Sequence, residues 1–291
     1  MKACLVFLIC LCGNIFGDHF LTYIIPCYNC EKWIEQAVES IYQQNLECPF
    51  ELICTDDRST DNTYEILRLL SQKHPEMIVL QHEKNRGGGA ARNTCVAHSR
   101  GDLIFCLDSD NVLVPNTVQL LINHMEATRS EIVSFGVVQY FRDDFVPLAS
   151  HVYEAKDQQY HLIDCVHKGN CPPWSGNYLY SRKSYDLAGG YPELTIDTYG
   201  FGFKQVVAGC KMTYVPGTFY WHRQEVMGYY DRSAKSGQLS IDFFKLLLSY
   251  PELFTGWTLK LMRKHMELIL EKSEYSWDST YFLEKRLINL R

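Results

Sequence analysis

Residues 20–25 read FLTYII, residues 51–55 read ELICT and residues 102–107 read DLIFCL. Each run is short and apolar and has no polar alternation, which predicts strands buried on both faces of a parallel sheet. Polar residues follow each run directly, as PCYN, DDRSTD and DSDN. Because open α/β sheets bind ligands beyond the carboxyl ends of their strands, we expect these polar segments to meet along one edge.

The stretches between these runs have helical periodicity. Residues 31–44, 60–72 and 90–99 repeat apolar residues at helical spacing, and residues 77–81 form a further apolar run. This β-α-β repetition predicts an α/β fold with a mostly parallel central sheet flanked by helices and right-handed crossovers. Further along we expect strands at 131–141, 177–181 and 211–215, a helix at 202–208, an irregular stretch at 142–173, and a helical C-terminal extension at 240–291.

The composition is that of a globular protein. The chain has 291 residues, of which 46% are hydrophobic and 21% charged, so it can bury a core of ordinary size. The length suggests one large domain, alone or with an appendage. The formal net charge of -6 is opposite to the broad basic footprint of a nucleic-acid-binding protein, so we expect no nucleic-acid partner.

The N-terminus resembles a targeting segment. Lys2 precedes an apolar run over residues 3–12, so residues 1–17 are interpreted as a signal peptide or a retained membrane anchor. A hydrophobic leading strand is the alternative. The first two interpretations place the protein in the secretory pathway or at a membrane, and the third leaves a cytoplasmic location open.

The chain has twelve cysteines, and three of them lie in this leader. The remaining nine are an odd number, so they cannot all pair within one mature chain. Cys27 and Cys30 form a C-x-x-C pattern. A zinc or redox role would need a second pair or a thioredoxin-like context, so we interpret these two cysteines as structural.

Asp108 and Asp110 end the fourth predicted strand. Spaced two apart, they can point to the same side, and two neighbouring carboxylates repel unless a cation lies nearby. Carboxylate oxygens suit Mn²⁺ or Mg²⁺, which complete their coordination with substrate phosphates and water. The alternative is a solvated turn, because Asp-Ser-Asp-Asn also favours turns.

Two other strand ends carry candidate binding groups. Asp57 follows the second strand and can accept hydrogen bonds from a nucleotide base or a ribose. Residues 87–89 are glycines at the start of a predicted helix, where backbone amides can cradle a phosphate, with Arg86 or Arg92 supplying positive charge. The chain contains no G-x-x-x-x-G-K-[ST] motif, which excludes an ATPase P-loop.

Four segments in this order resemble the signatures of family 2 glycosyltransferases of the GT-A fold: YIIPCYNCEKWI, ICTDDRSTDNT, NRGGGAARNT and GDLIFCLDSDN. The resemblance is strong over residues 20–115. It implies a GT-A domain over residues 18–239, with a nucleotide-sugar-binding half at 20–115 and an acceptor half at 116–239.

The resemblance also assigns roles to individual residues. It implies that His222 joins Asp108 and Asp110 as a metal ligand or contacts the diphosphate. Arg58 departs from the family pattern, which often has glycine there. The resemblance implies a nucleotide-sugar donor, most often a UDP-sugar. The candidate residues for binding it are Pro26, Tyr28, Asp57, Arg86, Arg92, Asp108 and Ser109.

The second half resembles the family less closely. The segment WSGNYLYSRKSYDLAGGYPE is similar to the part that shapes the acceptor side, and TIDTYGFGF is similar to a segment that begins with Glu-Asp in many members. The Glu position is Ile196 here, so Asp197 is the candidate general base that takes the proton of the acceptor hydroxyl. The candidate sugar or acceptor contacts are Trp174, Gly176 and Trp221.

We therefore expect a metal-dependent inverting glycosyltransferase that uses a carbohydrate, a lipid or a protein-linked group as acceptor. An inactive relative that binds sugar nucleotides or serves as a scaffold is the alternative. An aspartyl-phosphate phosphatase is disfavoured, because its carboxylate pair ends the first strand. The amphipathic extension leaves core packing, cleft covering, homodimer formation and membrane-surface contact open.

Overall fold

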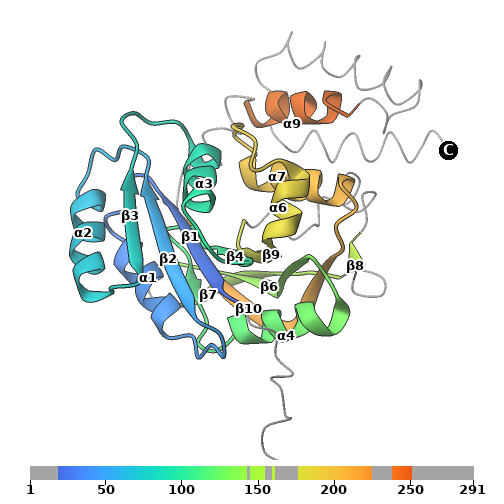
Figure 1. The fold of residues 1–291 in the computed structure, drawn as a ribbon, viewed down its shortest axis with the longest axis horizontal. Helices are drawn as coiled ribbons and strands as arrows, with labels where there is room; N and C mark the ends of the chain where they lie inside the picture. Colours follow the sequence, from blue (N-terminus) through green and yellow to red (C-terminus); the bar gives the residue numbers. More distant parts are fainter. Residues whose placement is uncertain (1–18, 143–144, 155–158, 161–175, 225–237, 251–291) are drawn as a thin grey trace, which may run out of the picture.

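The structure is a computed structural model that describes residues 19–142, 145–154, 159–160, 176–224 and 238–250 (Figure 1). The predicted leader at 1–17, Trp174 and most of the predicted extension lie outside the described residues. Among the helices of the described ranges, none has both the length and the apolar character needed to cross a membrane.

The first half follows the predicted alternation of strands and helices. The third strand has its predicted bounds, and the other elements begin or end within a few residues of theirs. The elements are β1 (Leu21–Cys27), α1 (Ile34–Tyr42), β2 (Phe50–Asp56), α2 (Thr63–Lys73), β3 (Met77–Gln81), α3 (Gly88–Ala97) and β4 (Leu103–Cys106).

The second half contains elements that the pattern did not reveal. Neither the helix after β4 nor the short helix after residue 181 was predicted. The elements are β5 (Val112–Leu113), α4 (Val118–Thr128), β6 (Ile132–Phe141), β7 (Pro147–Val152), β8 (Gln159–Tyr160), β9 (Tyr178–Ser181), α6 (Arg182–Ala188), α7 (Asp197–Val207), β10 (Met212–Arg223) and α9 (Gln238–Leu248).

These strands form one mixed sheet with the order β3-β2-β1-β4-β9-β6-β10-β5. The strands β3, β2, β1 and β4 run parallel, as does the β6–β10 pair, whereas β9 lies antiparallel to β4 and β6. The α/β fold class is confirmed, and antiparallel strands complete the parallel core. In Figure 1, α3, α6 and α7 lie on the opposite side of the sheet from α1 and α4.

The prediction that residues 142–173 are irregular is wrong where the structure describes them. β7 pairs with β6 along the edge of the sheet, with Val137 opposite Val152. Most of its side chains are exposed, so the strand has no inward apolar face and no alternation for the sequence to reveal. Pairing with β6, rather than an intrinsic pattern, makes this segment a strand.

The order of the strands locates the binding edge. β1 pairs with β2 on one side and β4 on the other, so the crossovers reverse direction between β1 and β4. Ligands of open α/β sheets bind at such a switch point. The ends of these two strands lead into Tyr28 and Asp108, which were both predicted as site residues.

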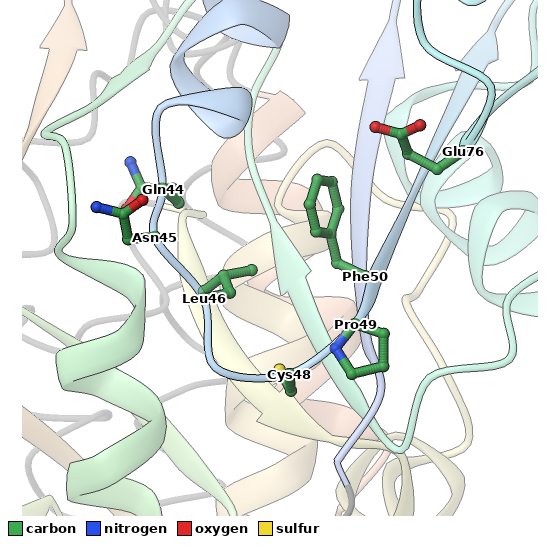
Figure 2. Close-up of a pocket in the computed structure, with 7 residues that line it drawn as sticks. All are labelled: Gln44, Asn45, Leu46, Cys48, Pro49, Phe50 and Glu76. Atoms are coloured by element: carbon green, nitrogen blue, oxygen red, sulfur yellow. The ribbon is translucent and has the colours of Figure 1, made fainter.

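A cavity of about 510 Å³ lies at the other ends of the strands (Figure 2). It opens beside the residues that precede β2 and β3, whereas the candidate site lies where the parallel strands end. This cavity is therefore separate from the predicted chemistry. Its lining residues are Gln44, Asn45, Leu46, Cys48, Pro49, Phe50 and Glu76.

Candidate active site

Asp108 follows β4 and is fixed by two partners. Its Oδ1 accepts a hydrogen bond of 2.6 Å from Arg92, and its Oδ2 accepts one of 3.1 Å from Asn177 Nδ2. The backbone N–H of Asp108 donates to Asn177 Oδ1 at 2.7 Å. Gly176 lies against the same carboxylate, because a Cβ added there would be 2.9 Å from Asp108 Oδ2.

Arg92 extends from α3 between two carboxylates. Its Nη2 donates to Asp108 and its Nη1 to Asp197, both at 2.6 Å, while Nε faces the Cys106 sulfur at 3.3 Å. Burial by itself lowers the pKa of Arg92, but Asp197, Cys106 and Asp108 outweigh it and raise that pKa well above its ordinary value. The repulsion that suggested a metal between carboxylates is therefore already relieved at Asp108 by a protein cation.

Asp197 is the first residue of α7. Its side chain is 14% exposed, its Oδ2 binds Arg92 and its Oδ1 accepts the N–H of Thr198 at 2.7 Å. Burial raises the pKa of Asp197, against the lowering effect of Arg92 and of the Thr198 N–H. A carboxylate with a raised pKa beside the strand ends has the properties of a general base.

The glycines at the start of α3 allow this contact between distant segments. A Cβ on Gly88 would lie 2.6 Å from Asp197 Oδ2, and one on Gly89 would lie 2.3 Å from the carbonyl oxygen of Pro192. The interpretation of residues 87–89 as a phosphate cradle stays a prediction, because these contacts concern the side-chain positions of Gly88 and Gly89 and not their backbone amides. Their missing side chains make room for residues 192–197.

Asp57 also occupies the amides that precede α3. Its carboxylate accepts hydrogen bonds from the backbone N–H groups of Arg86 (2.8 Å) and Gly87 (2.7 Å), and it faces His82 Nδ1 at 2.7 Å. Its side chain is 3% exposed. In this structure Asp57 shapes the loop that was predicted to border the nucleotide, and Arg86 reaches Glu193 at 3.2 Å.

The loop after β1 contacts the loop after β4 beneath the site. A hydrogen bond with Cys27 lowers the pKa of the Cys30 thiol, burial opposes it, and Ser109 adds to the lowering. Pro26 belongs to β1, and the ring of Tyr28 is 49% exposed. Tyr28 is thus an accessible aromatic surface at the switch point. All seven cysteines in the described part of the chain are free thiols.

His222 reaches the opposite side of the strand ends from β10. Asn111 Oδ1 accepts the backbone N–H of Arg223 at 2.9 Å, so the amide Nδ2 of Asn111 is the group that faces His222 Nδ1 at 3.3 Å. Burial lowers the pKa of His222 more than Asp108 raises it, which favours the neutral ring. With Nδ1 accepting, the neutral ring carries its proton on Nε2.

The metal prediction is only partly matched by this geometry. Across the ranges that the structure describes, no three His, Cys, Asp or Glu side chains are grouped so that they could bind a metal. Asp108 is paired with Arg92, and His222 Nδ1 is engaged by Asn111. Asp110 lies in the same turn, and its carbonyl accepts from Arg223 Nε at 3.0 Å. Asp108 and Asp110 supply two carboxylates, and proteins commonly bind Mg²⁺ through one or two carboxylates when substrate phosphates complete its coordination.

Several residues that complete the site were not predicted. Asn177, Asn111 and Arg223 each bridge two segments through side-chain amides or a guanidinium, and all three are buried. Asn93 accepts from Tyr191 N and donates to Tyr191 O, both at 2.9 Å, which fixes the turn after α6. Asn93 directly follows Arg92 in the segment NRGGGAARNT. Its place in that motif could have marked it as a site residue.

Trp221, which was predicted to contact a sugar, lies in a cluster of aromatic side chains. Its ring packs edge-on against Phe141, Phe145 and Phe219, with centroids 5.5 to 5.6 Å apart. It is half-buried in this aromatic cluster. Packing in the cluster therefore explains the residue without a ligand.

A sequence model described as "Glycosyl transferase family 2" matches residues 22–187, which is more than half of the chain. The chain belongs to glycosyl transferase family 2. The match covers the strand ends, Arg92 and Asn177, but it ends before Asp197 and His222.

Curated relatives are similar over about a third of the chain. A poly(ribitol-phosphate) beta-glucosyltransferase of Bacillus spizizenii is 31% identical over 114 residues, covering 38% of this chain and 18% of the relative. A chondroitin synthase of Escherichia coli is 41% identical over 99 residues, covering 34% of this chain and 14% of the relative. The chain thus spans less than a fifth of the length of either relative.

Solved structures share the fold of this family 2 chain. Staphylococcus aureus TarS (residues 1–349), solved with UDP-GlcNAc, has a TM-score of 0.60 at 19% identity, covering 78% of this chain and 64% of that one. A mannosyltransferase from Pyrobaculum calidifontis, solved with GDP-Man and Mn²⁺, has a TM-score of 0.55 at 17% identity, covering 93% and 79%. At these identities the likeness establishes the fold.

Proposed function

We propose that this family 2 chain transfers a sugar from a nucleotide-sugar to an acceptor hydroxyl, with Asp197 as the general base. The observation that carries the proposal is the Arg92 bridge, because it joins the first residue of α7 to the carboxylate that ends β4. The groups that we propose for donor binding and for proton transfer therefore lie at one edge of the sheet.

Asp197 has the chemistry that the transfer needs. An attacking hydroxyl must lose a proton as it bonds to the anomeric carbon, and a carboxylate within hydrogen-bonding distance takes it. Arg92 and Thr198 each use one position on the Asp197 carboxylate. A carboxylate has about four acceptor positions, so both contacts are compatible with a hydrogen bond from the acceptor.

We propose a UDP-sugar as the donor and inversion at the anomeric carbon. The exposed ring of Tyr28 offers a surface on which a base can stack, and Ser109 and Asp108 lie across the switch point from it. TarS was solved with UDP-GlcNAc and the Pyrobaculum enzyme with GDP-Man, so the fold accommodates more than one base. A single displacement by the acceptor oxygen, assisted by one base, inverts the centre.

We also propose that the donor enters with Mn²⁺ or Mg²⁺ at Asp110. A divalent ion there would offset the charge that develops on the diphosphate leaving group. The neutral His222 ring, with its proton on Nε2, is suited to donate a hydrogen bond to a diphosphate oxygen. We therefore propose that His222 contacts the diphosphate and does not coordinate the ion.

The decisive test measures nucleotide release by the purified chain across a panel of UDP- and GDP-sugars, with Mn²⁺, Mg²⁺ or EDTA. We expect slow hydrolysis of one UDP-sugar with metal present, and thermal stabilisation by UDP under the same conditions. Stabilisation without release would instead support a sugar-nucleotide-binding protein that lacks turnover. If no nucleotide diphosphate stabilises or is released, the proposal is wrong.

A further inference from the structure

Helix α9 contacts the segment before Asp197 through a buried carboxylate. Asp242 is 3% exposed, and its Oδ2 accepts hydrogen bonds from Thr195 N at 3.0 Å and Thr195 Oγ1 at 2.9 Å. Thr195 precedes Asp197 by two residues. Figure 1 shows α9 next to α7, whose first residue is Asp197.

The other oxygen of Asp242 is also occupied. Oδ1 accepts from Gln238 Nε2 at 2.9 Å and from Lys245 Nζ at 3.0 Å. Burial by itself would raise the pKa of Asp242, but these hydrogen bonds and those from Thr195 lower it overall. The carboxylate therefore remains ionised at neutral pH, although it is shielded from water.

The setting of Asp242 makes the contact specific. Leu239, Asp242 and Leu246 follow one another at helical spacing and are all buried, so the carboxylate interrupts an apolar stripe. A buried charge is costly unless it is paired, so α9 fits best in the register that brings Asp242 to Thr195.

Apolar packing supports the same register. A Cβ on Gly200 would lie 3.5 Å from Leu246 Cδ2 and 2.8 Å from Pro192 Cγ, so glycine there allows α9 and residue 192 to approach α7 together. Phe203 meets Tyr250 edge-on with ring centroids 5.6 Å apart. The contact between α9 and α7 thus continues for two turns beyond Thr195.

The start of α7 lacks a cap of the usual kind. The residue before Asp197 is Ile196, which has no side-chain acceptor, and no side-chain cap bond forms there. Helix starts are stabilised by oxygen acceptors and by negative charge. Within α7, Asp197 itself supplies both, because its Oδ1 accepts the N–H of Thr198. Asp242 fixes the backbone one residue ahead of Ile196, where it accepts the N–H of Thr195.

We propose that α9 is a clamp that sets the position of Asp197, with Asp242 as its positioning residue. The inference rests on the proposed role of Asp197 as the base. Arg92 binds the side chain of Asp197 from α3, whereas Asp242 fixes the backbone that leads into it from α9. The family match ends at residue 187, so the clamp lies in the part of this chain that the match does not cover.

The first test compares Asp242→Asn with Asp186→Asn, which makes the same chemical change at an exposed position on α6. Misplacing a catalytic group by about 1 Å lowers rates about 100-fold, so we expect Asp242→Asn to lower kcat about 10- to 100-fold. The Kd for the nucleotide diphosphate, measured by calorimetry, should stay within about twofold. Asp186→Asn should match the unmodified protein in both values.

Variants at Thr195 separate positioning from folding. Thr195→Ser retains both donors and should preserve kcat, whereas Thr195→Val removes only the Oγ1 donor and should give an intermediate loss. Equal losses of kcat in Thr195→Ser and Thr195→Val would contradict the clamp.

Hydrogen exchange provides a readout that needs no turnover. Backbone amides of residues 195–200 should exchange faster in Asp242→Asn than in Asp186→Asn, while those of β1 should not change. Unchanged exchange, or faster exchange with unchanged kcat, would overturn the proposal. If the unmodified protein uses no nucleotide-sugar, the proposed function fails, but this exchange still tests the contact by itself.

Discussion

Arg92 donates a hydrogen bond of 2.6 Å to Asp197, which lies 105 residues further along the chain. The same guanidinium binds Asp108 at the end of β4. The two predicted halves of the domain are therefore joined at the charged groups that were assigned to donor binding and proton transfer. Most of the predictions below concern this bridge.

Asp197→Asn should lower kcat for sugar transfer about 100- to 10,000-fold, the range that general base catalysis contributes. An amide preserves the shape but cannot accept the proton, so the Kd for UDP should not change. Stopped assays of transfer and calorimetry of UDP binding measure the two effects. Transfer at the unmodified rate would show that another group is the base.

The acidic limb of the kcat–pH profile should lie above the pH at which an ordinary aspartate titrates. Burial raises the pKa of Asp197, and only its ionised form accepts a proton, so activity falls as the pH drops through that raised pKa. Arg92→Lys weakens the opposing cation, because a lysine cannot bind both carboxylates through a planar fork. That variant should shift the limb to still higher pH, and a shift to lower pH would contradict the bridge.

Arg92→Met should reduce the free energy of unfolding by about 3–5 kcal/mol, the range for removing one partner of a buried ion pair. The loss arises because two carboxylates are left without their cation. Adding Asp197→Asn to this variant removes one of those charges and should restore part of the loss. Urea unfolding measures both, and a loss under about 1 kcal/mol would mean that solvent screens the bridge.

Asp110→Asn should abolish the dependence of UDP stabilisation on Mn²⁺, whereas His222→Gln should retain it and lower kcat. At 100 times Kd a bound ligand adds about 2.7 kcal/mol to the free energy of unfolding, which thermal unfolding readily detects. The contrast follows from the Asn111 contact, which leaves the His222 proton on Nε2. Loss of metal dependence in His222→Gln would instead make His222 a ligand.

Gly88→Ala should lower kcat about 10- to 100-fold by displacing Asp197, since the added methyl would lie 2.6 Å from its Oδ2. Gly209→Ala is the control, because nothing lies within 4 Å of a Cβ there. The control should lose some stability through its positive φ but no kcat. Equal kcat values in the two variants would show that the contact at Gly88 relaxes without consequence.

The sequence was informative where strands are buried on both faces. The runs that became β1, β2 and β4 are continuous, apolar and buried, and each ends in polar residues that the parallel order brings to one edge. The positions of Asp108 and Asp197 therefore follow from local pattern and motif order. The sequence does not predict their connection through Arg92, because a contact between distant segments leaves no periodic pattern of residues.

Other parts of the fold could not be read for physical reasons. β7 has exposed side chains and depends on pairing with β6, so no alternation marks it. The start of α7 was placed five residues too late, because Ile196 is an unusual residue before a helix and glycines at 200 and 202 weaken its pattern. The carboxylate that fixes the backbone just before Ile196, that of Asp242, lies on a different helix.

The insertion of β9 between β4 and β6 affects how the protein can be made. A ribosome must synthesise Tyr178–Ser181 before those two strands gain their shared neighbour. Until then each has an unpaired edge, and unpaired edges promote aggregation. Expression of residues 20–115 alone should therefore yield insoluble material. The two predicted halves are better regarded as a single folding unit, because β9 pairs with one strand from each of them.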